Sequence, residues 1–345
     1  MRKLFAVLLA LIMVLSMAAC AKEETQPTAA PAEAATEEPA VPASEAVPEV
    51  PDIHVMVLNG TTGFGMANLM DAAAKGEAEQ NYEFTVETDA SNIVAALVNG
   101  SADLAALPTN VASTVYNKTQ GRVQALALNT RGVLYLVTDG SVTVESMEDL
   151  EGLTVYAPAQ NPTFIFQGLV AAAGVENVTV DNTYAQPADL NAAVASGAVS
   201  VAVLPEPMVT VARTQNPDLV VALDLTAQWD QVYPAGSLVQ GCVVVRKEFA
   251  ESYPAAVALF LQEYGASIEG MTADVEGTAA KIEANGIFAK APVAAKAIPN
   301  CNVCFITGEE MKAALSEFLT IMHGVAPASV GGAVPGDDFY CILNG

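Results

Sequence analysis

Short apolar runs alternate with helix-like stretches over residues 53–128, and this alternation leaves the chain few possible folds. Four runs have the length and apolar character of buried strands, at 54–58, 82–86, 103–107 and 123–128. The stretches between them carry apolar residues at helical spacing, at 64–78, 93–98 and 110–117. Strands that alternate with helices favour a mainly parallel sheet with helices on both faces. We therefore predict an α/β fold.

The alternation is interrupted at residues 129–132, because the apolar run that follows begins without an intervening helix. Such a direct passage is typical of a chain that crosses from one domain into another. A second set of strand and helix patterns follows, and the run at 236–245 reads as a long returning strand. We predict two lobes, each a mainly parallel sheet flanked by helices, joined by two hinge strands. Their expected bounds are 53–130 with 241–345 for lobe 1, and 131–240 for lobe 2.

The N-terminus has the layout of an export signal. A basic start, Met1-Arg2-Lys3, precedes an apolar run at 4–15 and small residues before Cys20. The run is shorter than the roughly 20 residues that a membrane-spanning helix needs. A spanning anchor and an ordinary cleaved signal are the alternatives, but neither requires a cysteine at this place. The segment resembles the bacterial lipobox, in which the cysteine receives a diacylglycerol, although Met17 stands where leucine is usual.

We therefore predict a signal peptide over 1–20, lipidation at Cys20, and a lipid-anchored protein on the extracytoplasmic face of the cell membrane. Residues 21–52 are rich in Ala, Pro, Glu and Thr. Such a composition buries too little apolar surface to order a segment, and its prolines favour extended conformations. We expect this segment to be a disordered tether.

The charge balance excludes some partners. The chain has 14 Lys and Arg against 39 Asp and Glu, a formal net charge of -25. This argues against nucleic acid or an anionic membrane surface as a partner. With only two histidines, a histidine-rich metal site is not expected. We expect neither a metal nor a cofactor, and no nucleophile–base pair is visible.

Four cysteines besides Cys20 leave the disulfide state open. Cys242, Cys301, Cys304 and Cys341 allow three pairings, and the sequence does not choose among them. Cys301 and Cys304 have the spacing of a redox or half-zinc motif, but no second pair or histidine lies nearby. Structural thiols or a local disulfide are therefore favoured over metal or redox chemistry.

Three passages resemble a known family. Residues 146–155 match the pattern S-x-x-D-L-x-G-x-x-V/I, residues 97–105 match L-x-x-G-x-x-D-I/L-A, and 203–207 hold a Glu-Pro after a strand. Together with the lipobox and the two lobes, they are similar to bacterial ABC-transporter substrate-binding lipoproteins of the type II periplasmic-binding class. The nearest branch is that for nitrate, sulfonates, taurine and thiamine precursors.

The resemblance implies a monomer, not an enzyme, that captures a small molecule between its lobes and delivers it to permease subunits. The alternative is an enzyme or a sensor on the same fold, acting on a small heterocyclic metabolite. The scarcity of Lys and Arg favours a neutral or heteroaromatic solute over nitrate or sulfonate.

Candidate ligand residues follow the predicted strands, because ligands of open α/β sheets bind outside the carboxyl ends of strands. Each has a structural alternative: a turn or helix cap for the Gly, Thr and Asn residues, helix-dipole stabilisation for the Glu, and core packing for the Trp. The candidates are Thr61, Thr62, Gly63, Phe64, Thr109, Asn110, Asn161, Thr163, Glu206 and Trp229.

Overall fold

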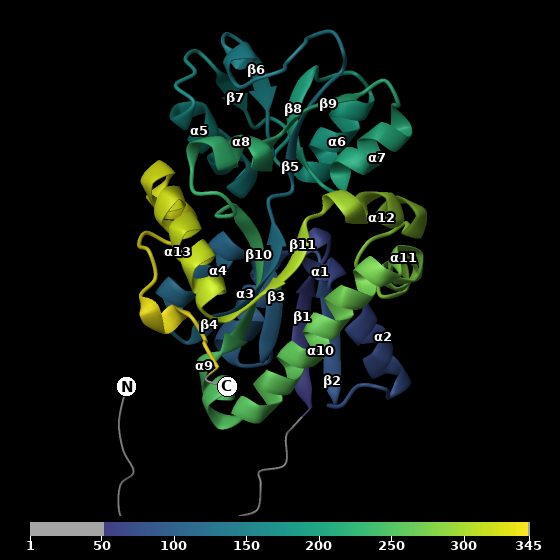
Figure 1. The fold of residues 1–345 in the computed structure, drawn as a ribbon, viewed down its shortest axis with the longest axis vertical. Helices are drawn as coiled ribbons and strands as arrows, with labels where there is room; N and C mark the ends of the chain where they lie inside the picture. Colours follow the sequence, from purple (N-terminus) through teal and green to yellow (C-terminus); the bar gives the residue numbers. More distant parts are fainter. Residues whose placement is uncertain (1–51, 344–345) are drawn as a thin grey trace, which may run out of the picture. The chain divides into compact units, whose positions relative to one another are not determined.

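The structure, a computed structural model, describes residues 52–343, in which two β-sheets are each flanked by helices (Figure 1). The predicted α/β fold is confirmed. Cys20, the signal segment 1–20 and the tether, except for its last residue Asp52, lie outside the described residues. No helix in the described part is both long and apolar enough to span a membrane.

Sheet A has six strands in the order β2-β1-β3-β10-β4-β11. Their bounds are β1 Ile53–Leu58, β2 Tyr82–Glu87, β3 Leu104–Pro108, β4 Val123–Arg131, β10 Val239–Arg246 and β11 Val303–Ile306. β1 pairs in parallel with β2 and β3, whereas β10 is antiparallel to both β3 and β4, and β11 is antiparallel to β4. Strands β1 to β4 therefore run in one direction, and β10 and β11 run against them.

Sheet B has five strands in the order β7-β6-β8-β5-β9. Their bounds are β5 Leu134–Thr138, β6 Thr154–Tyr156, β7 Thr179–Asp181, β8 Val201–Pro205 and β9 Val220–Asp224. β6 is parallel to β7 and β8, and β5 is antiparallel to β8 and β9. Only β5 therefore opposes the common direction.

The two sheets share one plan. If β11 is set aside, the order β2-β1-β3-β10-β4 in sheet A matches the order β7-β6-β8-β5-β9 in sheet B. In both, the opposed strand lies in the fourth place, and it is the strand that arrives from the other sheet. β5 follows β4 of sheet A after two residues, and β10 follows β9 and its helix in sheet B.

The helices surround these sheets and connect successive strands. Those attached to sheet A are α1 Thr61–Phe64, α2 Ala67–Lys75, α3 Ala90–Asn99, α4 Thr109–Thr119, α9 Lys247–Ser252, α10 Pro254–Ala273, α11 Val275–Ala284, α12 Ala291–Ala297 and α13 Gly308–Val325. Those attached to sheet B are α5 Asn161–Ala172, α6 Pro187–Ala195, α7 Met208–Gln215 and α8 Leu225–Val232. Short 3₁₀ turns lie at Glu148–Leu150, Ile298–Asn300, Pro327–Val330 and Asp337–Phe339.

Two differences from the sequence prediction have local causes. The helix expected over 64–78 is divided into α1 and α2, with a turn at Gly65 and Met66 between them. Helix α8 was not expected, yet it is capped at its start, where the Asp224 carboxylate accepts hydrogen bonds from the N–H groups of Thr226 and Ala227. The predicted strand at 236–245 begins three residues later, at Val239.

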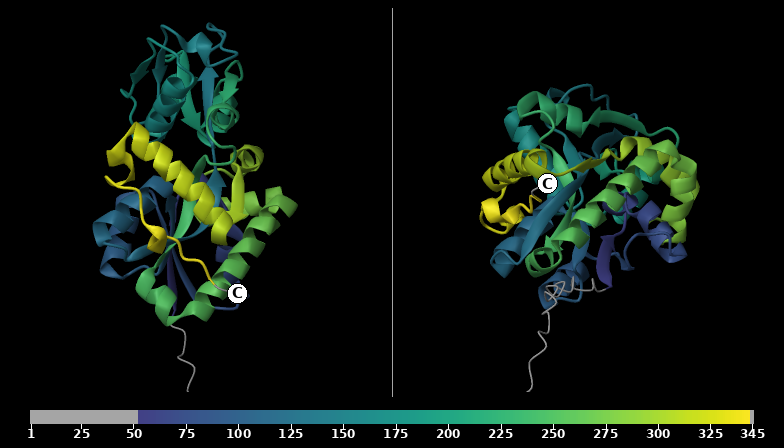
Figure 2. Two further views of the ribbon diagram at one scale, coloured as in Figure 1. Left: turned by 60° about the vertical axis from the view of Figure 1, so that its left-hand side comes forward. Right: turned by 60° about the horizontal axis from the view of Figure 1, so that its bottom comes forward.

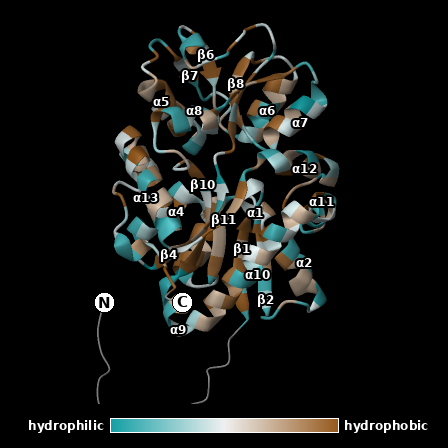
Figure 3. Cartoon of the chain, viewed as in Figure 1, coloured by the Kyte–Doolittle hydropathy of each residue, from teal (hydrophilic) through white to brown (hydrophobic). Residues whose placement is uncertain are grey.

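The hydrophobic core extends from one sheet to the other through one of its clusters of buried side chains. One cluster of buried side chains combines Leu107 and Leu128 of sheet A with Leu134 and Val155 of sheet B. Figure 3 shows hydrophobic residues concentrated on the strands of both sheets. Helix α13 packs on β4 and β10 of sheet A and also on α5 beside sheet B (Figure 2). The crossings and α13 thus connect the two halves.

Candidate ligand-binding site

Strand register brings the carboxyl ends of strands in both sheets to the crossings. Arg131, the last residue of β4, pairs with Val239 at the start of β10, and Pro108 at the end of β3 pairs with Gly241. In sheet B, Leu134 at the start of β5 pairs with Pro205, the last residue of β8. The carboxyl edges of the two sheets therefore lie on either side of the same pair of crossings.

We call the loops at these edges the seam. They follow β1 and β3 in sheet A and β6 and β8 in sheet B, at residues 59–64, 108–110, 157–163 and 205–207. One hydrogen bond joins the two sides, because the Thr61 hydroxyl donates to the Glu206 carbonyl oxygen at 2.8 Å. Thr61 and Glu206, 145 residues apart in sequence, are both buried. The structure thus brings two of the predicted site residues together.

On the sheet A side, the other predicted residues are held mainly by main-chain partners. The Thr109 hydroxyl is fully buried and donates to the Val239 carbonyl at 2.8 Å. The buried Asn110 side chain has one long contact, 3.5 Å from its Nδ2 to the Ser329 carbonyl, and its Oδ1 has no hydrogen-bond partner. A carboxamide in this state can accept a donor from a bound molecule.

The loop after β1 is packed tightly. A Cβ at Gly63 would lie 2.6 Å from the Leu58 carbonyl oxygen, so only glycine fits there. The Thr62 carbonyl accepts a hydrogen bond from Asn129 Nδ2 at 3.0 Å. Phe64 is fully buried and meets Phe288 edge-on, with ring centroids 6.2 Å apart. For Gly63 these contacts agree with the turn that the sequence left open as the structural alternative, and Phe64 lies in the core.

On the sheet B side, Asn161 and Thr163 lie in the first turn of α5. The Thr163 hydroxyl donates to the Pro158 carbonyl at 2.7 Å and accepts from Asn182 Nδ2 at 2.6 Å. Asn161 is buried, and its Oδ1 has no hydrogen-bond partner. Asn110 and Asn161 therefore each bury a side-chain oxygen that has no hydrogen-bond partner, and they do so on opposite sides of the seam.

Glu206 is a buried carboxylate with its own local partners. Its two oxygens accept hydrogen bonds from the N–H and the hydroxyl of Thr210, at 3.1 and 3.0 Å. Burial raises the pKa of the Glu206 carboxyl, and the bonds from Thr210, the Arg213 charge and the Asn300 side chain oppose that rise. The protonated form is thus favoured more than in water.

Trp229 lies in the core. Its ring is fully buried and packs against Tyr233 and Phe318, with ring centroids 4.4 and 5.9 Å away. Its Nε1–H donates to the Ser237 hydroxyl at 2.8 Å. These contacts favour core packing over the ligand contact that we also considered.

Sequence reasoning missed a segment that connects the two lobes at residues 300–304. The Tyr135 hydroxyl of β5 donates to the Asn300 carbonyl at 2.9 Å. Asn302 Nδ2 donates to the Gly132 carbonyl at 2.6 Å, and the Arg131 N–H donates to the Asn302 carbonyl at 3.0 Å. The Cys-x-x-Cys spacing marked this segment in the sequence, but the contacts to the crossing come from its asparagines and main chain.

The cysteines of the described part are thiols. Cys242, Cys301, Cys304 and Cys341 are free, so the structure favours structural thiols over a local disulfide. Burial raises the pKa of Cys304 to about 11 and raises that of Cys301 further, which leaves both unreactive at neutral pH. Among residues 52–343, no group of three or more His, Cys, Asp and Glu side chains is placed to hold a metal ion.

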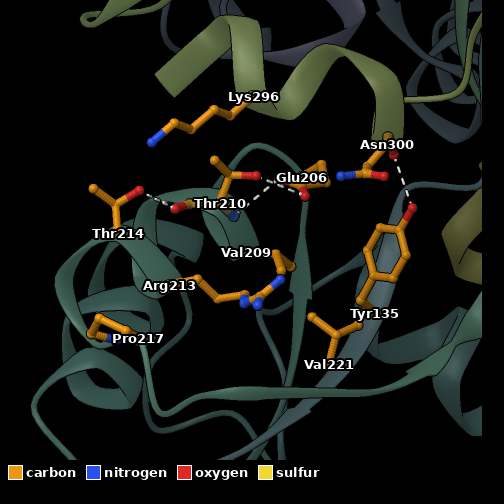
Figure 4. A pocket seen from close by; sticks show the side chains of 10 residues that line it. All are labelled: Tyr135, Glu206, Val209, Thr210, Arg213, Thr214, Pro217, Val221, Lys296 and Asn300. Atoms are coloured by element: carbon orange, nitrogen blue, oxygen red, sulfur yellow. Dashed lines mark hydrogen bonds between the residues drawn. The ribbon is translucent and has the colours of Figure 1, made fainter. Parts of the chain in front are cut away.

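A cavity of about 590 Å³ adjoins the seam at Glu206 (Figure 4). Of its lining residues, only Glu206 was predicted. Thr210, Arg213, Thr214 and Pro217 recur at three- and four-residue spacing along and just beyond α7, a pattern that could have marked one polar face. The complete lining is Tyr135, Glu206, Val209, Thr210, Arg213, Thr214, Pro217, Val221, Lys296 and Asn300.

Two sheets of one strand order, joined by two crossings with polar loops at their facing edges, define the two-lobe type II periplasmic-binding fold. Solved structures agree. A crystal structure described as an ABC transporter from Parabacteroides distasonis has a TM-score of 0.72 and 22% identity, covering 85% of this chain and 99% of that one. No curated protein matches the chain.

Two other structures are also similar in fold. The periplasmic aliphatic sulphonate binding protein of Escherichia coli has a TM-score of 0.65 and 16% identity, covering 82% of this chain and 96% of that one. The ligand-binding component of an ABC-type import system from Staphylococcus aureus, with zinc bound, has a TM-score of 0.65 and 14% identity, covering 84% and 96%.

The family comparison gives the identification. The family described as the substrate binding domain of the ABC-type glycine betaine transport system matches residues 53–298, and this chain belongs to it. The protein is therefore the substrate-binding component of an ABC import system, and the predicted transport role is confirmed. Its family and structural neighbours are transport binding proteins of the extracytoplasmic side.

Proposed function

We propose that this protein captures a small polar solute at the seam, between lobe 1 (53–130 and 241–345) and lobe 2 (131–240), and presents it to permease subunits as a monomer. One observation carries the proposal. Asn110 and Asn161, on opposite sides of the seam, each bury a carboxamide oxygen that has no partner. An unsatisfied buried acceptor costs about 1–3 kcal/mol. A solute with N–H or O–H groups would remove that cost on both lobes.

The chemistry of the seam supports a neutral or amine-bearing solute. The polar side chains around it are mainly hydroxyls and amides, and the one carboxylate, Glu206, already accepts two bonds from Thr210. A betaine head group has no N–H or O–H, and neither does an unsubstituted alkanesulfonate. Neither offers the donor that Asn110 Oδ1 and Asn161 Oδ1 lack. Small amides, pyrimidines and taurine, through its ammonium group, do offer one.

A solute held from both sides would also stabilise the closed arrangement. The contact from Thr61 to Glu206 closes the seam in this structure. A bound molecule that bridges the lobes shifts the equilibrium between open and closed protein toward the closed form. The size of this shift is set by the difference between its affinities for the two forms. The permease can then distinguish the loaded protein from the empty one.

The test is a thermal-shift screen, followed by calorimetry, over small amides, pyrimidines, taurine, alkanesulfonates, nitrate and glycine betaine. A ligand at about 100 times its Kd adds about 2.7 kcal/mol to the free energy of unfolding. We expect a donor-bearing solute to bind and Asn110→Ala and Asn161→Ala to weaken it about tenfold or more.

Asn92→Ala is the matched control, because Asn92 is an exposed residue of α3 that donates to Glu87. A solute that binds the two variants as tightly as the wild type contradicts the seam as its site. We also propose binding without catalysis, and sustained turnover of any compound in the screen contradicts that.

We further propose that the protein is held at the membrane by a lipid on Cys20. The support is the basic, apolar and small-residue order of residues 1–20 in a chain whose family works outside the cytoplasm. Cys20→Ser should move the protein from the membrane fraction to the soluble extracellular fraction in the producing cell. Retention of the variant in the membrane would show that another segment anchors it.

A further inference from the structure

The cavity beside α7 has walls from both lobes. Arg213 and Thr214 come from α7, and Tyr135 and Val221 from strands of sheet B. Lys296 of α12 and Asn300 in the turn after it, from the part of the chain that follows β10, form the opposite wall (Figure 4). Helices α7 and α12 pack against each other beside it. A molecule in this cavity would touch both lobes.

Two positive side chains face this cavity. Figure 4 shows Lys296 extending from α12 on one side and Arg213 from α7 on the other. Within residues 52–343, ion pairs form between other basic residues and carboxylates, but neither Arg213 nor Lys296 takes part in one. In a chain with 39 acidic and 14 basic residues, a carboxylate partner would be easy to find. Arg213 and Lys296 thus line one cavity without a carboxylate from the described part of the chain in hydrogen-bond or ion-pair contact with either of them.

Among the residues that the structure describes, Glu206 is the one carboxylate of the cavity, and the Arg213 charge acts on it, but no hydrogen bond or ion pair joins the two side chains, and none reaches Lys296. The two oxygens of Glu206 accept from Thr210, the Thr214 hydroxyl donates to the Thr210 carbonyl at 2.7 Å, and the Tyr135 hydroxyl donates to the Asn300 carbonyl. The guanidinium of Arg213 and the ammonium of Lys296 are left as donors for something else. Charge-assisted hydrogen bonds from such groups suit carboxylate, sulfonate, sulfate and phosphate oxygens.

We propose that this cavity is a second binding site, separate from the solute contacts of Asn110 and Asn161, which takes a small oxyanion group between Arg213 and Lys296. The oxyanion bridges α7 and α12 and so strengthens the closed arrangement of the lobes. The site does not depend on which solute the seam binds. Inorganic sulfate or phosphate and the sulfonate or carboxylate of an organic molecule present the same chemistry, and separate titrations distinguish them.

The test titrates the full-length chain with millimolar sulfate, phosphate, methanesulfonate or acetate, at ionic strength held constant with sodium chloride, and without any seam solute. We expect the melting temperature to rise and saturate with at least one of these anions. The half-saturating concentration should increase about tenfold or more in Arg213→Gln and in Lys296→Gln. Both side chains are exposed at the rim, so neither change disturbs the fold.

Lys290→Gln is the control, because Lys290 is an exposed lysine just before α12 that does not line the cavity. It should keep the half-saturating anion concentration of the wild type.

A rise of the melting temperature that never saturates, or that is equal in wild type and Arg213→Gln, overturns the proposal. Such a rise is the general stabilisation that excluded anions give all proteins. A radius of gyration unchanged by a saturating anion, measured by small-angle X-ray scattering, overturns the bridging of the lobes. Loss of seam binding with the anion effect intact contradicts only the solute proposal.

Discussion

At the scale of single residues, Glu206 combines the most functions. Its carbonyl receives the Thr61 hydroxyl across the seam, its N–H donates to the Val133 carbonyl, and its carboxylate accepts from Thr210. The main chain at Glu206 thus closes the seam, while its side chain serves the start of α7. The two parts can be separated by mutation, because a change of the carboxylate leaves both main-chain bonds in place.

The pH dependence of stability should report the buried carboxyl of Glu206. Burial raises its pKa in the folded state, so the folded protein holds this proton more tightly than the unfolded chain does. The free energy of unfolding therefore falls as pH rises from the ordinary carboxyl value of about 4.3 through the raised pKa. We expect Glu206→Gln to gain stability relative to the wild type over this range, measured by urea unfolding between pH 4 and pH 7.

The control for this comparison is Glu176→Gln, because Glu176 is exposed in the loop between α5 and β7. The difference in free energy of unfolding between Glu176→Gln and the wild type should not show the pH dependence expected for Glu206→Gln. A difference between Glu206→Gln and wild type that stays constant from pH 4 to pH 7 would mean that the carboxyl titrates as it does in the unfolded chain.

At the scale of elements, the two crossings are fixed by close packing and by the segment 300–304. A Cβ at Gly132, in the first crossing, would lie 2.2 Å from Thr226 Oγ1, and one at Gly241 in β10 would lie 2.4 Å from Asn129 Oδ1. Both positions require glycine because no space is left. Asn302 then joins the first crossing to β11 through its side chain and its carbonyl.

Two substitutions of Asn302 separate the contribution of its side-chain hydrogen bond from that of its backbone conformation. The residue has a φ of 44°, in the left-handed region that asparagine tolerates better than most residues, and its side chain holds the Gly132 carbonyl. Asn302→Ala should lower the free energy of unfolding by about 2 kcal/mol, from the lost hydrogen bond and the added strain. Asn302→Gly should recover part of this loss, because glycine relieves the strain but cannot donate.

Urea unfolding of the three proteins provides the measurement. If Asn302→Ala and Asn302→Gly are equally stable, the left-handed backbone conformation at this position adds no strain to the alanine variant. If both equal the wild type, the hydrogen bond to Gly132 does not stabilise the crossing.

At the scale of the whole molecule, Trp229 reports how the lobes meet. It is the only tryptophan of the chain and belongs to α8 of lobe 2, whereas its neighbour Phe318 belongs to α13, which packs on β4 and β10. Opening of the lobes should separate these two rings. We expect a bound seam solute to reduce quenching of Trp229 fluorescence by acrylamide, because closure buries the indole fully.

Trp229→Phe provides the control by calorimetry. Because the ring is packed in the core rather than along the seam, this variant should bind the solute with an unchanged Kd. A large loss of affinity would instead place the indole at the ligand, and unchanged quenching with a confirmed solute would mean that α8 and α13 stay together when the protein binds.

Local sequence patterns were sufficient for the α/β class, for most strands and helices, and for the order of elements. Apolar periodicity, glycine and proline breaks and the missing helix at 129–132 are short-range signals that a chain carries wherever it folds. They also placed Thr61, Asn110, Asn161 and Glu206 after strands, where ligand loops of such sheets lie. Helix α8 was missed because its short sequence carries too few apolar residues to show a helical period. Its one clear signal is the N-cap residue Asp224, which does not predict a helix by itself.

Only the tertiary structure decided which of these residues meet. The contact of Thr61 with Glu206 and that of Asn302 with Gly132 join positions more than a hundred residues apart, and no local pattern encodes them. The burial of Trp229 under α13 and the placing of Arg213 opposite Lys296 likewise depend on how helices pack. The sequence by itself determined the fold class and the binding role of this protein, because these follow from periodicity and motif. The pairing of side chains across the seam and the cavity required the folded chain, because only packing sets the distances between them.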